Sequence, residues 1–122
     1  MAAAPVGQPR NRKFVELKAP EMFKFTKPSQ LVEGVLVRIE PTVVNQEGGH
    51  QSETLEYMVQ MPNGDRLTFL GTNDLNKKIR AEYIGHWHRI RYERDDSSFV
   101  KPGQSAAKVF KVDVDPEKEP GY

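Results

Sequence analysis

Residues 71–85 are the one stretch of this 122-residue chain with a helical pattern. Leu75, Ile79 and Tyr83 recur every four residues, so they share one face of a helix. The segments on both sides have the pattern of strands and loops. A single short helix must therefore fit between two groups of strands, and this order constrains the fold more than any other feature.

Both ends of the helix have suitable residues. Thr72 or Asn73 can supply the capping oxygen for the free backbone donors of the first turn, where the charge of Asp74 also suits the helix dipole. Gly85 can adopt the left-handed conformation that closes a helix. We predict a helix over residues 73–82.

Alternating apolar and polar residues predict five strands, three before the helix and two after it. In the first strand, Val35, Val37 and Ile39 share one face, and Gly34 suits a bulge or tight bend. Asn63 and the following glycine favour a hairpin turn between the second and third strands. The predicted strands are residues 31–44, 55–61, 66–70, 86–94 and 107–114.

The chain is long enough for one domain with a core, and we predict that domain over residues 14–114. Residues 1–13 are predicted to be a flexible tail and residues 115–122 an acidic tail. The 18 basic and 17 acidic side chains nearly cancel, so binding to nucleic acid needs a local patch. There is no cysteine, no apolar run long enough for a membrane span and no secretory signal pattern, and we therefore expect a cytoplasmic protein.

Three short segments resemble one family. Residues 27–36 resemble the opening of phage-type single-stranded-DNA-binding proteins with an OB-fold. Residues 70–79 resemble the junction between strand and helix in that family, and residues 110–114 its closing strand. The resemblance covers roughly residues 25–115. It implies an all-β fold with one helix: a five-stranded OB-fold Greek-key barrel with the helix between strands 3 and 4.

The resemblance implies binding of single-stranded DNA. OB-folds bind strands on the outer face of strands 2 and 3 and with the loops that join strands 1–2 and 4–5. Such a site needs cations along the phosphates and flat side chains for stacking. The arginines lie at strand positions predicted to face outward. Trp87 and Phe99 are the candidate stacking platforms, and Met58 and Thr68 add apolar contact. The candidate nucleic-acid-binding residues are Arg38, Met58, Arg66, Thr68, Trp87, Arg89, Arg91, Phe99 and Lys101.

Other roles stay open for several of these residues. Trp87 can equally be a packing residue that covers the helix end, and the arginines can simply solvate a sheet face. The loop after the first strand counts against DNA binding, because it contains Glu47 and Glu53 without lysine or arginine. Tyr57 and Phe69 lie at strand positions predicted to face inward, and we predict that they lie in the core.

Catalytic and metal sites are not expected. The sequence has no glycine-rich phosphate loop, nucleophile elbow or zinc-protease motif. His86 and His88 share one side of a strand, but no third ligand is nearby. We expect His88 to line the core and His86 to be exposed, with no cofactor bound.

Two functions therefore remain. The first is sequence-tolerant binding of single-stranded DNA in replication, recombination or repair, with replication or recombination proteins as further partners. The second is an OB-fold module for protein–protein contact in a replication or phage assembly. The acidic end resembles the partner-recruiting tails of bacterial single-strand binders, but Lys118 interrupts its acids. A solvated terminus is the alternative, and the sequence does not decide DNA against RNA or the oligomeric state.

Overall fold

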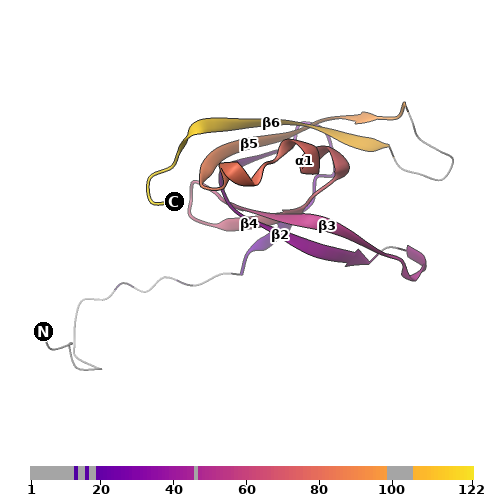
Figure 1. The fold of residues 1–122 in the computed structure, drawn as a ribbon, viewed down its shortest axis with the longest axis horizontal. Helices are drawn as coiled ribbons and strands as arrows, with labels where there is room; N and C mark the ends of the chain where they lie inside the picture. The colour runs from indigo at the N-terminus through magenta and orange to yellow at the C-terminus, as the bar shows by residue number, and fades with distance from the viewer. Residues whose placement is uncertain (1–12, 14–15, 17–18, 46, 99–105) are drawn as a thin grey trace, which may run out of the picture.

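The computed structural model describes residues 13, 16, 19–45, 47–98 and 106–122. In these residues the protein is mostly β with one α-helix, as predicted, and Figure 1 shows the arrangement. The predicted flexible tail, residues 1–13, lies outside them except for Lys13. The elements are β1 (Glu21–Phe23), β2 (Leu31–Asn45), β3 (Gln51–Gln60), β4 (Arg66–Leu70), α1 (Asn73–Lys78), β5 (His86–Asp96) and β6 (Ala107–Lys118), with 3-10 turns η1 (Glu47–Gly49) and η2 (Ala81–Tyr83).

The sheet has six strands in the described part of the chain, in the order β1-β4-β3-β2-β5-β6. We predicted five, because β1 lies in a segment that has no clear alternation. Its residues Glu21–Phe23 pair in parallel with β4, while every other pairing is antiparallel. The first and last strands in this order are not paired with each other, so the sheet is open.

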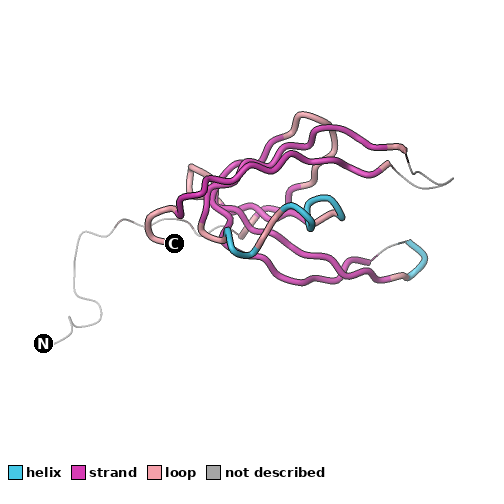
Figure 2. The backbone as a smooth tube through the Cα atoms, turned by 45° about the horizontal axis from the view of Figure 1, so that its top comes forward, coloured by secondary structure: helices cyan, strands magenta, loops and turns pink. Residues whose placement is uncertain are grey.

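The long strand β2 connects two layers. Its residues 31–35 pair with β5, and its residues 35–45 pair with β3. Figures 1 and 2 show β5 and β6 on one side and β2, β3 and β4 on the other, with α1 between them. A bulge between Leu36 and Arg38 separates the two halves of β2.

Because of this bulge, the residues of the first predicted strand that face the core differ from those predicted to share a face. Val37 was predicted to share a face with Val35 and Ile39, but it is only partly buried, whereas Leu36 between them is fully buried. The extra residue shifts the side-chain alternation, so Val32 and Leu36 point inward before it and Ile39 packs against the core after it. Gly34 is not at the bulge. It allows a close approach instead, since a Cβ there would lie 2.3 Å from the carbonyl oxygen of Gln60.

The helix is shorter than predicted. Thr72 caps it as one of the two expected residues, with its Oγ1 accepting from the Leu75 N–H at 3.2 Å. The backbone becomes extended at Ile79, and only the separate turn η2 follows. The chain thereby reaches β5 through Gly85, whose N–H donates to the Leu36 carbonyl at 2.7 Å and whose φ is 93°. Of the three residues predicted to share one helix face, Leu75 and Ile79 are buried and Tyr83 is partly buried, but Ile79 and Tyr83 lie after the end of α1.

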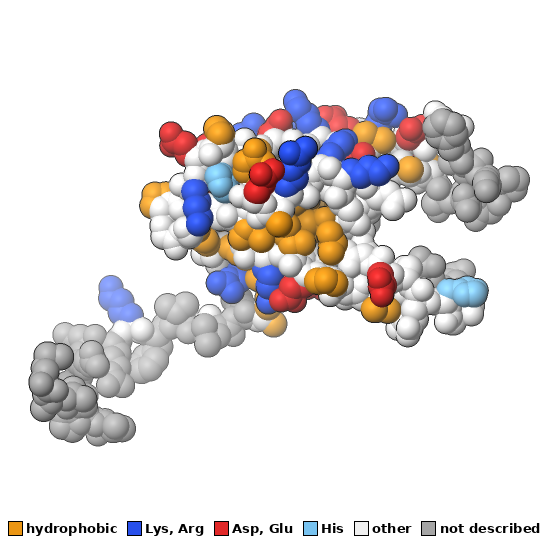
Figure 3. All heavy atoms as spheres, in the orientation of Figure 1, with side chains coloured by type: hydrophobic (Ala, Val, Ile, Leu, Met, Phe, Trp, Pro, Cys, Tyr) orange, Lys and Arg blue, Asp and Glu red, His pale blue; other side chains and the backbone are white. Residues whose placement is uncertain are grey.

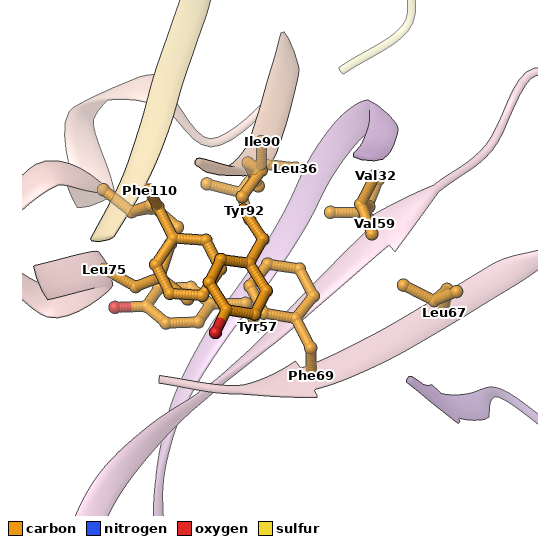
Figure 4. Packing of buried hydrophobic residues seen from close by; sticks show 11 residues of the cluster. Val32, Leu36, Tyr57, Val59, Leu67, Phe69, Leu75, Ile90, Tyr92 and Phe110 are labelled. Atoms are coloured by element: carbon orange, nitrogen blue, oxygen red, sulfur yellow. The ribbon is translucent and has the colours of Figure 1, made fainter. Parts of the chain in front are cut away.

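Aromatic rings from both layers meet in the core (Figure 4). Tyr57 stacks on Phe69 with centroids 5.4 Å apart, and Tyr92 lies 5.4 Å from Phe110. Phe25 joins the two pairs edge-on, 5.7 Å from Phe69 and 4.9 Å from Phe110. Because β4 and β6 are not paired, Phe25 fills the opening of the sheet between them.

The helix is held to the edge of β6 by polar contacts. The Phe110 N–H donates to Asp74 Oδ2 at 2.8 Å, and Lys78 Nζ donates to the Phe110 carbonyl at 2.6 Å. Lys78 also forms an ion pair with Asp74 at 2.9 Å. Two backbone groups at the open edge of the sheet therefore find partners on the helix.

The segment predicted as an acidic tail is partly strand. β6 continues to Lys118, where residues 115–122 were expected to be outside the domain. The Glu119 N–H then donates to the Gly85 carbonyl, and the Tyr122 hydroxyl donates to Gln60 Oε1 at 2.7 Å. These contacts fold the segment back onto the sheet. None of the helices in the described residues has the length and apolar character needed to span a membrane.

Candidate nucleic-acid interface

One group of predicted site residues forms a row across the outer face of the layer made by β2, β3 and β4. Thr68 on β4 pairs with Met58 on β3, which pairs with Arg38 on β2, and Met22 on β1 lies beside Thr68. Arg38 is exposed and forms an ion pair with Glu40 at 3.3 Å. Met58 and Thr68 are each only 5% exposed, so they present almost no surface to a ligand.

β1 accounts for part of this burial. The Thr68 hydroxyl lies 3.4 Å from the Glu21 carbonyl oxygen and 3.8 Å from Met22 Sδ. Met22 itself is 51% exposed. The apolar contact surface on this face is therefore supplied by Met22, which the sequence pattern did not identify because β1 was not recognised as a strand.

The second group surrounds Trp87 on the outer face of β5. Glu33 Oε1 accepts from Trp87 Nε1 at 3.2 Å and from Arg89 Nε at 3.1 Å. These two hydrogen bonds, in that order of importance, lower the pKa of Glu33. The indole of Trp87 is partly buried and the Arg89 side chain is 56% exposed. Both predicted contact residues are thus already bonded to one carboxylate.

Acidic residues also approach Trp87 from β6. Arg89 pairs with Asp113 in the strand register, on the side opposite Glu33. A shallow hollow of about 240 Å³ is lined by Trp87, Arg89, Asp113, Val114 and Asp115. This hollow contains two carboxylates against one guanidinium, which does not favour a phosphate.

The remaining predicted cations are exposed but dispersed. Arg66 is at the start of β4 and pairs with Gln60, while Arg91 on β5 pairs with Leu31 and Lys111. Neither arginine forms an ion pair within the described part of the chain. Arg66 and Arg91 belong to β4 and β5, which lie in different layers (Figure 1).

Two predicted residues, Phe99 and Lys101, lie outside the described residues. Their part in a site stays a prediction.

The histidines of β5 have structural partners. His88 is buried as predicted, and its Nδ1 lies 2.9 Å from the His86 carbonyl oxygen. Burial lowers the pKa of His88. His86 is only partly exposed, with Nδ1 2.8 Å from the Asp115 carbonyl oxygen. Residues 19–45, 47–98 and 106–122 contain no group of three or more His, Asp or Glu side chains arranged for a metal ion.

A denser group of cations lies between α1, η2 and β6, where none was selected from the sequence. Lys77, Lys78, Arg80 and Lys111 line a hollow of about 460 Å³ together with Phe110 and Val112. Figure 3 shows Lys and Arg side chains gathered over this side of the molecule. The outer face of the helix was visible in the sequence, but its position beside β6 depends on long-range packing.

An apolar hollow lies at the other end of the helix. It has a volume of about 230 Å³ and lies over the gap between β4 and β6 that Phe25 fills. Lys24 and Lys108 are its two charged residues. The residues that line it are Met22, Phe23, Lys24, Phe25, Phe69, Leu70, Thr72, Lys108 and Phe110.

Comparisons with protein-family models, with curated proteins and with solved structures find no match to this chain.

Proposed function

We propose that this protein is an OB-type barrel that binds single-stranded DNA without sequence preference. The strand order carries this proposal. Without β1, the sheet reads β4-β3-β2-β5-β6, with α1 in the connection between β4 and β5. This is the order of three strands, a helix and two strands expected of the OB-fold, a partly open Greek-key barrel.

The positions of the hairpin ends support the same function. The β2–β3 hairpin and the ends of β5 and β6 extend beyond the barrel on the same side (Figures 1 and 2). OB-folds use the loops at these two places to bind oligonucleotides. Exposed lysines of α1 and β6 and the partly exposed rings of Phe23 and Phe25 supply the cations and flat surfaces that such binding requires. We infer from this activity a role in replication or recombination.

A second function, contact with another protein, is favoured by one observation. The hollow beside Trp87 is rimmed by Asp113 and Asp115, and Glu33 holds the indole N–H. An aromatic ring in an acidic setting suits a basic or apolar protein surface better than a phosphate chain.

A salt titration separates the two functions. Fluorescence anisotropy with a labelled oligo-dT strand, at salt concentrations from about 0.05 to 0.2 M, measures the affinity and its dependence on salt. Single-strand binding requires that log K falls linearly with log salt, by about 0.7 units per phosphate neutralised. A duplex of equal length should bind more weakly. Absence of binding to oligo-dT at the lowest salt would contradict the proposal and favour the protein-contact function.

A further inference from the structure

Three hollows adjoin along the side of α1 that faces β6. The apolar hollow of about 230 Å³ shares Thr72 and Lys108 with a middle hollow of about 390 Å³. The middle hollow shares Lys77 with the basic hollow of about 460 Å³. We call these three together the α1–β6 trough. It continues from the apolar opening between β4 and β6 to the cations of α1 and β6.

The trough is basic. Its lining has six cations against the two carboxylates of Asp74 and Asp96. Both acids already have partners, since Asp74 accepts from Lys78 and from the Phe110 N–H, while Asp96 accepts from the Ser98 N–H at 3.0 Å. The six cations are Lys24, Lys77, Lys78, Arg80, Lys108 and Lys111.

Several of these cations are available to a ligand. Lys24, Lys77 and Lys111 are exposed and make no ion pair within the described residues. Lys78 is occupied by Asp74 and the Phe110 carbonyl, so it holds the wall of the trough. Within the described residues, the side chain of Arg80 forms one ion pair, with the exposed carboxylate of Glu82 at 3.5 Å.

The apolar end of the trough has supported aromatic rings. Phe23 and Phe25 lie edge to face with centroids 4.9 Å apart, and Phe25 is fixed in turn against Phe69 and Phe110. Phe23 is partly exposed, and its neighbour Met22 is 51% exposed. A flat apolar group can therefore contact a ring that the core holds in place.

We propose that a single strand lies in the α1–β6 trough, with a base against Phe23 at the apolar end and phosphates along Lys77 and Lys111. This inference rests on the proposed function and names the surface that performs it. Charge complementarity selects a polyanion, and the adjoining aromatic pocket selects one with unstacked bases. A duplex keeps its bases stacked and does not supply such a group.

Two matched double variants test the position of the phosphates. Lys77→Gln with Lys111→Gln removes two charges from the trough. Arg66→Gln with Arg89→Gln, the control, removes two charges at residues predicted from the sequence to bind DNA, which lie outside the trough. In the oligo-dT titration, the trough variant should flatten the salt slope by about one to two units, because each lost phosphate contact removes up to about one. The control variant should keep the parent's slope. Circular dichroism checks that both fold.

A third variant tests the base contact. Phe23→Leu keeps an apolar side chain but removes the ring, and it should weaken oligo-dT binding about five- to a hundredfold. Its affinity for an abasic strand of equal length should stay that of the parent, because that strand has phosphates but no bases. An equal loss for both strands would mean general damage and would contradict the base contact.

The outcomes separate this inference from the function on which it rests. A parent that binds no oligo-dT contradicts the proposed function. A parent that binds, with the trough variant unchanged and the control variant weakened, overturns the trough alone. Polyglutamate that binds the parent more tightly than oligo-dT does, and that loses this affinity in the Lys77→Gln and Lys111→Gln variant, would instead make an acidic peptide the occupant and overturn the inference.

Discussion

The outer face of β5 and the α1–β6 trough both combine an aromatic ring with cations, but they differ in what lies opposite. Beside the outer face of β5, Glu33 of β2 accepts hydrogen bonds from both Trp87 and Arg89, and Asp113 of β6 pairs with Arg89 from the other side. In the trough the two acids are bonded internally, and Lys77 and Lys111 remain available. The contrast teaches that strand pairing decides the charge of a surface more than neighbours in the sequence do.

The difference also extends to stability. The residues around Trp87 are held by one partly exposed ion pair, between Arg89 and Glu33, and such pairs contribute little to folding. The wall of the trough depends on buried contacts, with Leu75 fully buried beneath the helix and Asp74 bonded to β6. Substitutions in the two regions should therefore differ in their cost, and we give the expected effects from the largest to the smallest.

The largest effect is expected for Leu75→Ala. This side chain has 0% exposure, so its truncation leaves a cavity between α1 and the aromatic core. Unfolding by urea, followed by circular dichroism, should show a loss of about 2–5 kcal/mol in the free energy of unfolding. Val43→Ala, on the outer part of β2 where Val43 is 55% exposed, is the control. An unfolding midpoint like that of the parent would show that the helix does not cover the core.

Asp74→Ala should have the next largest effect. It leaves the Phe110 N–H without its acceptor and Lys78 without its ion pair. Loss of the partner of a buried donor costs about 1–3 kcal/mol. The matched control is Asp113→Ala on the β5–β6 face, where the exposed carboxylate should change stability by less than about 0.5 kcal/mol. Equal effects of the two variants in urea unfolding would remove the distinction between the regions.

The fold was largely predictable because side-chain alternation identifies strands. The inward positions of Tyr57, Phe69 and His88 were predicted correctly, and Leu75 and Ile79 of the predicted helix face are buried. A bulge or tight bend in this strand was predicted at Gly34, but the bulge follows Leu36, where one extra residue reverses the alternation. β1 was missed because a three-residue parallel strand shows no period of its own.

The site was less predictable than the fold. Four arginines were correctly predicted to face outward, since all are exposed: Arg38, Arg66, Arg89 and Arg91. The alternation gives the face on which a side chain lies, but not the residue of the neighbouring strand that pairs with it. The carboxylates around Arg89 were therefore not predicted. The burial of Met58 and Thr68 depends on β1, and the gathering of Lys77 and Lys111 depends on how α1 packs against β6. Each of these features arises from contacts between segments far apart in the sequence.

A pH titration examines the buried side of β5. The pKa of His88 is lowered below its ordinary value of 6.5 by burial, so the unfolded chain takes up the proton first as pH falls. Stability is therefore full above pH 6.5 and declines as pH falls below it, by no more than about 1.4 kcal/mol per pH unit for one proton.

The measurement uses a variant in which His88 is the remaining histidine of the three, with His50→Gln and His86→Gln. Urea midpoints between pH 7.5 and 5 should still decline in this variant. An NMR titration of the His88 ring should give a pKa below that of the unfolded chain. A His88 that titrates at or above pH 6.5 would contradict its burial as a neutral ring.

The smallest effect is expected for Glu33→Gln, which changes the charge of the β5 face and nothing in the trough. The amide oxygen can still accept from Trp87 Nε1, while the ion pair with Arg89 is lost. Because the pKa of Glu33 is lowered, this pair contributes above about pH 4.5 and is lost as pH falls below it. The pair is exposed, so at pH 7 the variant should lose about 0–1 kcal/mol in stability.

Its effect on oligo-dT binding decides between the two regions. Glu33 pairs with Arg89 on β5, which pairs with Asp113 on β6, two residues from Lys111. By ordinary sheet spacing, Glu33 and Lys111 are therefore about 12 Å apart. That distance exceeds the Debye length of about 8 Å at 0.15 M salt. If the strand lies in the trough, affinity at this salt should stay within about twofold of the parent. If phosphates contact Arg89, removal of the competing carboxylate should strengthen binding and steepen the salt slope. The second result would place the strand on the face of β5.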